Sequence, residues 1–179
     1  MYRILWKAGL SMLLSREDDK MASRPITGRH GMARGRLRGF DPARLRTARA
    51  ALGMTQEQLA IRTGVTRSVI TSWEAGKNAP DPRRAKVLAE LLGTTIADLT
   101  VLEEPDVRPA DYRAWRGLTR EGLSDLTGIG VNPLAEIERY ARHPSSDLVK
   151  RIAEALSIDP AIYAAAWDRG RHAAEAGEL

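Results

Sequence analysis

The sequence predicts an all-α protein made of two tandem five-helix domains, and two observations support this fold class. Helix-start signals recur, because an Asp able to cap a helix precedes a Pro suited to the first helical position at Asp41-Pro42, Asp81-Pro82 and Asp159-Pro160. The chain also repeats itself without a gap. Residues 49–97 share 15 identities with residues 113–161, where chance would give about 3 or 4.

The first domain is predicted to open with a helix over residues 41–52. A second helix starts at Thr55, which forms a capping box with Gln58, and Gly64 ends it in a left-handed conformation. Thr66 is expected to cap the third helix with its hydroxyl. The pattern is therefore helix, tight turn, helix.

The remaining boundaries follow from where the apolar pattern lapses. A helix over residues 82–92 and a short helix opened by Thr95 complete the first domain, and Glu103-Glu104-Pro105 indicates a linker. We expect four parts: a basic flexible segment, the first domain, a linker, and a second domain with a C-terminal helix, at residues 1–40, 41–100, 101–109 and 110–179.

Composition and charge narrow the function. The 179 residues include no Cys and three widely separated His, which excludes disulfides and thiolate metal sites, predicts no cofactor and fits a reducing cytosol. Residues 1–105 carry 18 basic and 11 acidic side chains, whereas residues 106–179 carry 10 and 12. The basic half suits a polyanion. No apolar run approaches the roughly 20 residues of a membrane helix, so we expect a cytoplasmic protein with no membrane partner.

A basic tract interleaved with Gly precedes the first domain. Such a tract cannot pack a core. It is either a solvated tail or an arm that enters the minor groove of DNA through Arg34, Arg36 and Arg38. Met21 and Met32 leave a third option open, that translation starts later and residues 1–31 are not native.

Two short helices joined at Gly64 form a helix-turn-helix unit, whose second helix enters the major groove of DNA. The alternative interpretation is an ordinary corner between two helices, with no role in DNA binding. The flanks favour the first interpretation, because they resemble the Cro and phage-repressor type helix-turn-helix family, the xenobiotic response element class with a lambda-repressor-like fold. The matching positions are Leu45, Arg49, Gly53-Met54-Thr55-Gln56, Leu59-Ala60, Gly64-Val65, Ile70, Trp73-Glu74, Gly76-Lys77, Pro80, Leu88 and Leu91-Leu92-Gly93.

This resemblance implies a structural salt bridge in each repeat, because the family pairs the positions of Arg49 and Glu74, which recur as Arg113 and Glu138. It also implies that Gln56 contacts a phosphate and braces the reading helix. We expect further phosphate contacts that fix register, from Thr66, Lys77 and Asn78.

Base reading is assigned to the start of the third helix. Arg67 is the strongest candidate, since its planar fork can pair with O6 and N7 of guanine, and Ser68, Thr71 and Ser72 are weaker readers. The Thr71 methyl could also meet a thymine methyl. Arg67 departs from the commonest family residue, Gln, so an adenine contact is not assumed.

The second repeat keeps the scaffold and loses this face. Its counterparts of the reading and phosphate residues include Val131, Asn132, Ala135, Glu136 and Ala141. Asn132-Pro133 predicts that its third helix begins about two residues late. Arg120, Arg139 and Arg142 leave weak DNA contact open, but self-association through residues 110–179 or docking is favoured. The small-residue helix after Pro160 packs either on a partner or on its own domain.

Together these features predict a sequence-specific regulator of transcription that binds a double-stranded DNA operator. A repressor is favoured, either of phage immunity or of a bacterial gene. The alternative is an antitoxin-like interaction module that binds DNA only secondarily. No catalytic motif and no small-molecule site is evident, so we do not expect an enzyme.

Overall fold

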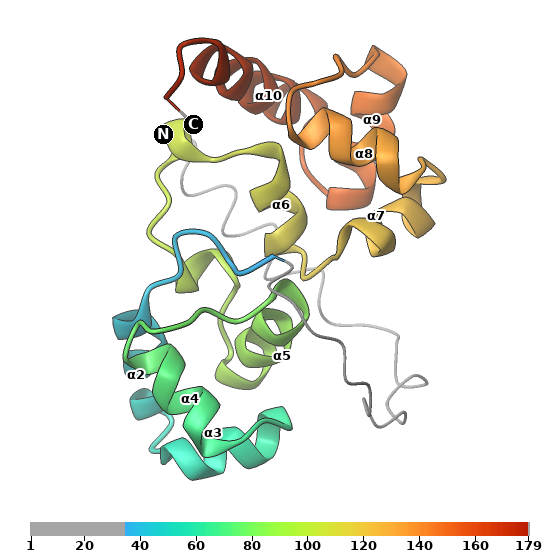
Figure 1. Cartoon of the computed structure of the whole chain (residues 1–179). Helices are drawn as coiled ribbons and strands as arrows, with labels where there is room; N and C mark the ends of the chain where they lie inside the picture. Colours follow the sequence, from blue (N-terminus) through green and yellow to red (C-terminus); the bar gives the residue numbers. More distant parts are fainter. Residues whose placement is uncertain (1–34, 179) are drawn as a thin grey trace. The chain divides into compact units, whose positions relative to one another are not determined.

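A computed structural model describes residues 35–178 of the chain. Apart from one isolated β-bridge, the regular structure of these residues is helical, in agreement with the predicted class. Figure 1 shows the helices in chain order. The first repeat comprises the helices α2 Pro42–Ala51, α3 Gln56–Thr63, α4 Arg67–Glu74 and α5 Pro82–Leu92 and the 3₁₀ turn η1 Ala97–Leu99. A second 3₁₀ turn, η2 Glu104–Asp106, follows it. The second repeat comprises the helices α6 Pro109–Trp115, α7 Arg120–Thr127, α8 Val131–Glu138, α9 Ser146–Leu156 and α10 Pro160–Glu175.

Local signals in the sequence fix most helix starts. Asp41, Asp81 and Asp159 each accept a hydrogen bond from a backbone N–H of the first turn, and a Pro follows each of them. Thr55 caps α3 through both hydrogen bonds of the capping box. Gly64 ends α3 with φ 67°, a left-handed conformation that the tight turn into α4 requires.

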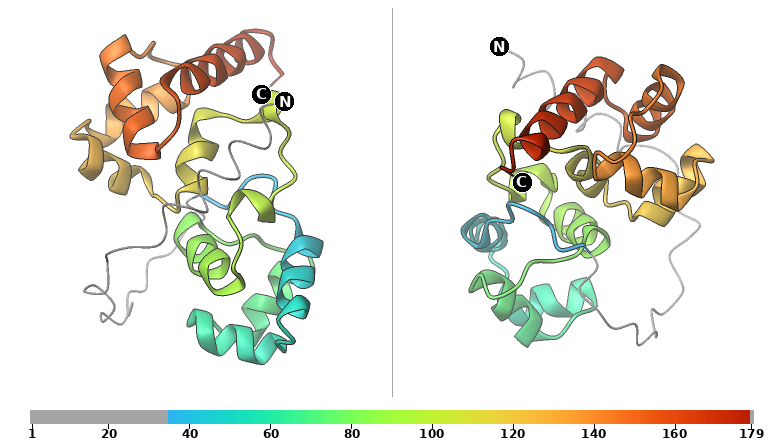
Figure 2. Two further views of the ribbon diagram at one scale, coloured as in Figure 1. Left: turned by 180° about the vertical axis from the view of Figure 1, so that it is seen from behind. Right: turned by 45° about the horizontal axis from the view of Figure 1, so that its top comes forward.

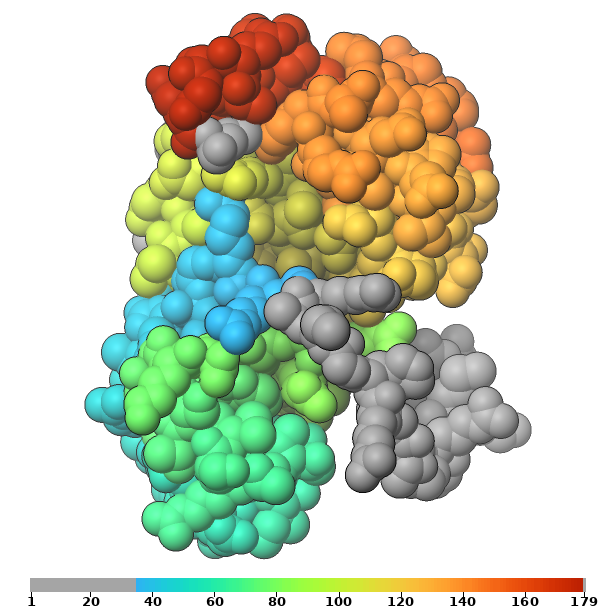
Figure 3. All heavy atoms as spheres, viewed as in Figure 1, coloured from blue at the N-terminus to red at the C-terminus, as the bar shows by residue number. Residues whose placement is uncertain are grey.

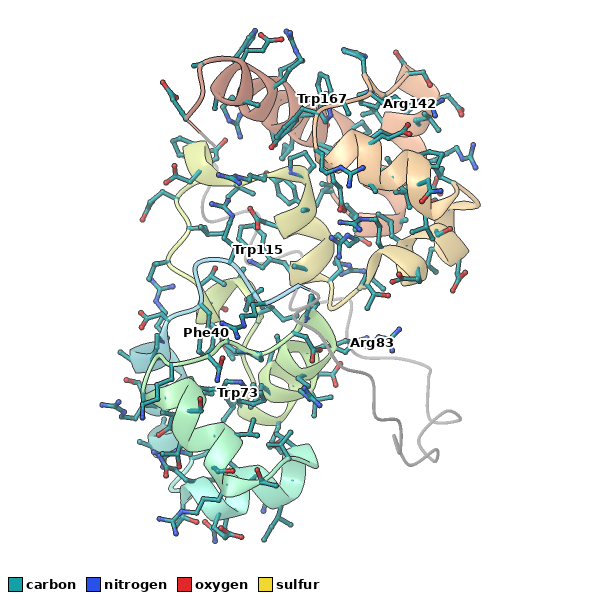
Figure 4. The ribbon with its side chains drawn as sticks, in the orientation of Figure 1. Phe40, Trp73, Arg83, Trp115, Arg142 and Trp167 are labelled. Atoms are coloured by element: carbon teal, nitrogen blue, oxygen red, sulfur yellow. The ribbon has the colours of Figure 1, made fainter. Side chains whose placement is uncertain are left out.

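Each repeat has its own apolar core built from equivalent positions. In the first, Leu45, Leu59, Ile70 and Leu88 are fully buried, and Trp73 of α4, labelled in Figure 4, is 4% exposed. The second repeat buries residues of the same kind, among them Leu123, Leu134, Ile152 and Leu156, and Ile137 takes the place of Trp73. The repeat seen in the sequence is therefore a repeat of packing.

The C-terminal helix α10 closes its own domain. Trp167, Tyr163 and Ala166 are buried, and the Trp167 indole N–H donates to the Ile137 carbonyl at 2.8 Å. Figure 4 shows Trp167 between α10 and α8. Of the two roles left open for this helix, the structure shows packing on its own domain.

The segment before α2 differs from its prediction. Residues 37–41 are hydrogen-bonded to the first repeat. The Leu37 N–H donates to the Pro80 carbonyl at 2.9 Å, and Phe40 forms an isolated β-bridge with Thr100. Leu37 is 4% exposed. The last residues of the segment that we expected to be flexible, residues 37–40, therefore pack on the first repeat, because their backbone finds hydrogen-bond partners there.

The predicted linker of residues 101–109 is also partly structured, since η2 lies within it and Val107 is buried. A second correction concerns α8. It starts at Val131, in register with α4, and the Asn132-Pro133 pair does not delay it. Pro133 is tolerated because it falls in the first turn, where its missing N–H has no helical partner.

Two left-handed residues show how strongly the repeat conserves backbone shape. Tyr140 (φ 62°) and Ser157 (φ 53°) are the non-glycine residues with positive φ in the part of the chain that the structure describes. They occupy the places of Gly76 (φ 70°) and Gly93 (φ 64°). The second repeat therefore keeps turns that cost more without glycine.

Candidate nucleic-acid interface

The candidate interface is a shallow hollow on the surface of the first repeat, above α4. Helices α3 and α4 lie side by side in both views of Figure 2, and both reach the surface seen in Figure 3. The hollow is lined by Gln56, Arg67, Ser68, Thr71, Ser72, Ala75 and Lys77. It thus brings together all four predicted base readers and two of the four predicted phosphate contacts.

Helical periodicity divides α4 into two faces. Ile70 and Trp73 point into the core, with 0% and 4% of their surface exposed. Arg67, Ser68 and Thr71 are exposed on the other side. Because apolar positions recur every three to four residues, burying them aims the polar side chains at solvent as a group.

A buried ion pair between α2 and α4 fixes the position of α4, the helix that carries the hollow. Arg49 Nε lies 2.6 Å from Glu74 Oε1, and Arg49 Nη2 lies 3.0 Å from Glu74 Oε2. The Glu74 side chain is 3% exposed. Burial by itself would raise the pKa of Glu74, but hydrogen bonds from Arg49 and Gln56 outweigh it and hold that pKa below its usual range. The carboxylate is therefore ionised at neutral pH.

Gln56, on the first turn of α3, connects this ion pair to the reading helix. Its Nε2 donates to Glu74 Oε2 at 2.8 Å, and its Oε1 accepts from the Thr71 hydroxyl at 3.0 Å. The side chain therefore spans from the buried pair to the exposed face of α4. This geometry fits a brace for α4, and it leaves one of the two amide hydrogens for an outside acceptor.

The other residues assigned to the interface differ in their surroundings. Arg67 and Lys77 are exposed, and neither forms an ion pair within the described part of the chain. Asn78 donates from Nδ2 to Ser72 Oγ at 3.0 Å. Thr66 occupies the N-cap position of α4, but its hydroxyl meets Ser68 Oγ at 2.8 Å and makes no cap. The predicted hydroxyl cap is thus wrong, because a neighbouring hydroxyl competes for the same oxygen.

The three arginines assigned to a minor-groove arm have different surroundings. Arg34 lies outside the described residues, and Arg36 is exposed. Arg38 is engaged within the protein: its Nη2 lies 2.5 Å from Asp111 Oδ2, and it also donates to the Asp106 carbonyl. The Asp111 side chain is 8% exposed. Arg38 is therefore a structural residue here, which corrects its place in the arm.

The second repeat reproduces the scaffold of the site. Arg113 Nε lies 2.5 Å from Glu138 Oε1, matching the first repeat. Arg120 stands where Gln56 does and donates to Glu138 Oε2 at 2.9 Å. Glu136, at the place of Ser72, has Arg142 3.8 Å away. Two of its three predicted residual cations thus face carboxylates of their own repeat.

Sequence reasoning missed two features of this region. Nothing in the sequence pairs Arg38 with Asp111, which is 73 residues away. Arg46 likewise donates to the Glu74 carbonyl at 2.7 Å, adding a third link between α2 and α4. Both depend on where a long, flexible side chain meets a partner distant in the sequence, and no local pattern encodes that.

Residues 35–178 hold no sign of a metal centre or a membrane span. No cluster of three or more His, Asp or Glu side chains there could hold a metal ion. None of the helices described is both long enough and apolar enough to cross a membrane.

A helix-turn-helix unit with a polar, outward-facing second helix defines the class of DNA-binding helix-turn-helix domains. The comparison with known families agrees. The helix-turn-helix family model matches residues 45–99 and 110–163, more than half of the chain, so the protein belongs to this family and contains two copies of its domain.

Relatives with a curated description are regulators of transcription. An uncharacterized HTH-type transcriptional regulator of Archaeoglobus fulgidus is 39% identical over 64 residues, which is 36% of this chain and 91% of the relative. One of Methanothermobacter thermautotrophicus is 43% identical over 61 residues, or 34% and 88%. The HTH-type transcriptional activator BcrR of Enterococcus faecalis is 36% identical over 61 residues, but these are only 30% of its length. No solved structure matches. Family and relatives together indicate a DNA-binding regulator of transcription.

Proposed function

We propose that this protein binds a specific double-stranded DNA operator by placing α4 in the major groove. The observation that carries the proposal is the hollow above α4, where Arg67, Ser68, Thr71 and Ser72 converge with Gln56 and Lys77. An exposed guanidinium can pair with O6 and N7 of guanine, so Arg67 is the main reader of sequence.

Phosphate contacts then fix the register of α4 on the duplex. Lys77 offers a charge in the same hollow, and Gln56 offers the amide hydrogen that Glu74 does not use. Thr66 and Asn78 lie close to these residues in the sequence and complete the predicted set. Such contacts add affinity that salt weakens, and they carry no sequence information themselves.

Of the two directions of regulation we propose repression, by a phage immunity repressor or a bacterial regulator. A repressor needs only to occupy DNA that overlaps a promoter, whereas an activator needs a further surface for the transcription machinery. The activator among the relatives aligns over only 30% of its length, so most of that protein has no counterpart in the alignment.

The second repeat is assigned to protein interaction, with self-association as the first candidate. Its reading face has lost the polar set, and Arg120 is bound to Glu138. A carboxylate at Glu136 would oppose a phosphate or an acceptor-rich base edge. The same observation favours the alternative function, an antitoxin-like module that masks another protein, and sedimentation of the full chain alone separates self-association from a need for a partner.

A promoter reporter tests the proposal in cells. A site selected from random DNA is placed across the promoter, and expression is compared with the wild-type protein and with Arg67→Ala. Repression should fall by about tenfold or more, the effect of removing a bidentate hydrogen bond to a base. Arg62→Ala is the matched control, because Arg62 is also exposed, on α3, but lies outside the hollow. Equal repression by both variants would overturn the assignment of Arg67, and higher expression with the wild-type protein would overturn repression.

A further inference from the structure

Contacts within the protein determine whether the Thr71 hydroxyl donates a hydrogen bond to a base or accepts one from it. The hydroxyl can in principle donate to a base or accept from one. Two acceptors of the protein lie within reach of its proton: Gln56 Oε1 and the carbonyl of Arg67, each at 3.0 Å.

The orientation of the Gln56 amide follows from the ion pair beneath it. A carboxylate only accepts hydrogen bonds, so the atom of Gln56 that faces Glu74 must be Nε2, which lies 2.8 Å from Glu74 Oε2. The carbonyl oxygen Oε1 is then the atom that faces Thr71. Because Arg49 keeps Glu74 ionised, this orientation holds at neutral pH.

The Thr71 hydroxyl proton is therefore committed inward. The Arg67 carbonyl cannot donate, and the oriented Gln56 amide presents only an acceptor to Thr71. What Thr71 turns toward solvent is a pair of oxygen lone pairs and a methyl group. Thr71 is exposed, so both can reach a ligand in the hollow.

We infer that Thr71 reads a base that carries an exocyclic amino group, adenine through N6 or cytosine through N4, by accepting its hydrogen bond. In the major groove these amino groups are the donors, whereas guanine O6 and thymine O4 are acceptors that Thr71 cannot serve. This inference rests on the proposed function, since it needs α4 in the major groove. It makes Arg67 a donor to guanine and Thr71 an acceptor one helical turn later.

The spacing of the two residues indicates where to look in an operator. Residues four apart on a helix are about 6 Å apart along its axis, and successive base pairs are about 3.4 Å apart. The pair read by Thr71 should therefore lie within about two steps of the guanine read by Arg67. Every base pair carries one such amino group, so the arrangement predicts that a base pair within about two steps of that guanine is preferred in one orientation, the one that places its adenine N6 or cytosine N4 within reach of Thr71.

The test combines protein and DNA changes. Sites are selected from random DNA with the wild-type full chain, with Thr71→Val, which keeps the shape without the hydroxyl, and with Thr71→Ser, which keeps the hydroxyl. At the predicted base pair the wild-type preference should drop by about fivefold in Thr71→Val, the effect of one hydrogen bond. Thr71→Ser should retain most of it. The preference for the Arg67-dependent guanine should not change.

A base analogue then isolates the amino group. In the selected site, adenine is replaced by purine, or cytosine by 2-pyrimidinone, each of which lacks the amino group. Wild-type affinity should fall by about fivefold, and Thr71→Val should show no further loss on the same DNA. Equal losses for both proteins would overturn the inference.

The outcomes also separate this inference from the function on which it rests. If the wild-type chain selects no site at all, the proposed function fails. An Arg67-dependent site that is indifferent to the Thr71 hydroxyl overturns this inference alone. Thermal melting of each variant confirms that it is folded.

Discussion

At the scale of single residues, the ion pairs Arg49–Glu74 and Arg113–Glu138 have the strongest structural role. Each joins the first and third helices of its repeat, with carboxylates 3% and 4% exposed. A buried ion pair of this kind adds little to the stability of the fold relative to an apolar pair of equal shape. Removing one partner is costly, however, because it leaves a buried charge without a counter-charge. The pair therefore fixes the position of the third helix more than it raises stability.

Replacing Glu74 by Gln should lower the free energy of unfolding by about 3 kcal/mol, because it leaves Arg49 buried without its counter-charge. Urea denaturation measures the loss. Glu90→Gln is the matched control: Glu90 is half exposed and 3.9 Å from Lys86, so its change should stay within about 0.5 kcal/mol. Equal effects of the two substitutions would contradict the structural role of the pair.

The same variant carries a pH signature. Because the folded-state pKa of Glu74 lies below its ordinary value of 4.5, its stabilising effect is present above that value and is lost as pH falls through the folded-state pKa. The wild-type protein should therefore lose more stability on acidification below pH 4.5 than Glu74→Gln does. Parallel pH profiles would argue against an ionised Glu74 in the fold.

At the scale of the elements, helix caps decide where the reading unit begins. Thr55 makes both bonds of its capping box, whereas Thr66 holds the N-cap position of α4 without a capping hydrogen bond. The hydroxyls of two similar residues in similar places thus have different roles. One stabilises a helix, and the other does not.

Thr55→Ala should accordingly lower the unfolding free energy by about 1 kcal/mol, the typical effect of removing an N-cap. Thr66→Ala should lower it by less than about 0.5 kcal/mol. Chemical denaturation of the two variants side by side provides the check. A larger decrease for Thr66→Ala would mean that its hydroxyl caps α4 after all.

The elements also show how far sequence can go. Asp-Pro pairs, the Thr55 box and Gly64 are local signals, and the structure contains the helices they predict. The delayed start expected for α8 is wrong, because tertiary packing of Leu134 and Ile137 sets its register more strongly than Asn132-Pro133 does. In the site, outward residues of α4 follow from periodicity. The relay through Gln56 to Thr71 and the Arg38–Asp111 pair depend on three-dimensional contacts that no local pattern reports.

At the scale of the whole molecule, residues 35–178 fall in one compact unit that contains both repeats. The residues that join its two halves include Arg38 and Asp111, one from each side of the linker. The excess of positive charge nevertheless belongs to residues 1–105. The excess lies ahead of the first helix, since residues 1–40 carry nine basic and three acidic side chains and residues 41–105 carry nine and eight.

This excess of positive charge leads to a prediction for the basic residues that precede the fold. Deleting residues 1–34, which removes Arg34 and keeps Arg36, should weaken DNA binding. It should also reduce the slope of log affinity against log salt by about one for each phosphate that the segment neutralises. Titrations at several salt concentrations measure the slope. Residues 37–41 stay in place and keep their hydrogen bonds to the first repeat, so the fold is preserved. Unchanged slopes would make the segment a solvated tail.

The most direct test of sequence reading by α4 is selection of binding sites from random double-stranded DNA with the purified wild-type chain and with Arg67→Ala. We expect the wild-type protein to enrich a motif containing a guanine. Arg67→Ala should lose preference for that guanine while keeping its salt-sensitive affinity for random DNA. The absence of any motif for the wild-type protein, or the same motif for both proteins, would contradict sequence reading by α4.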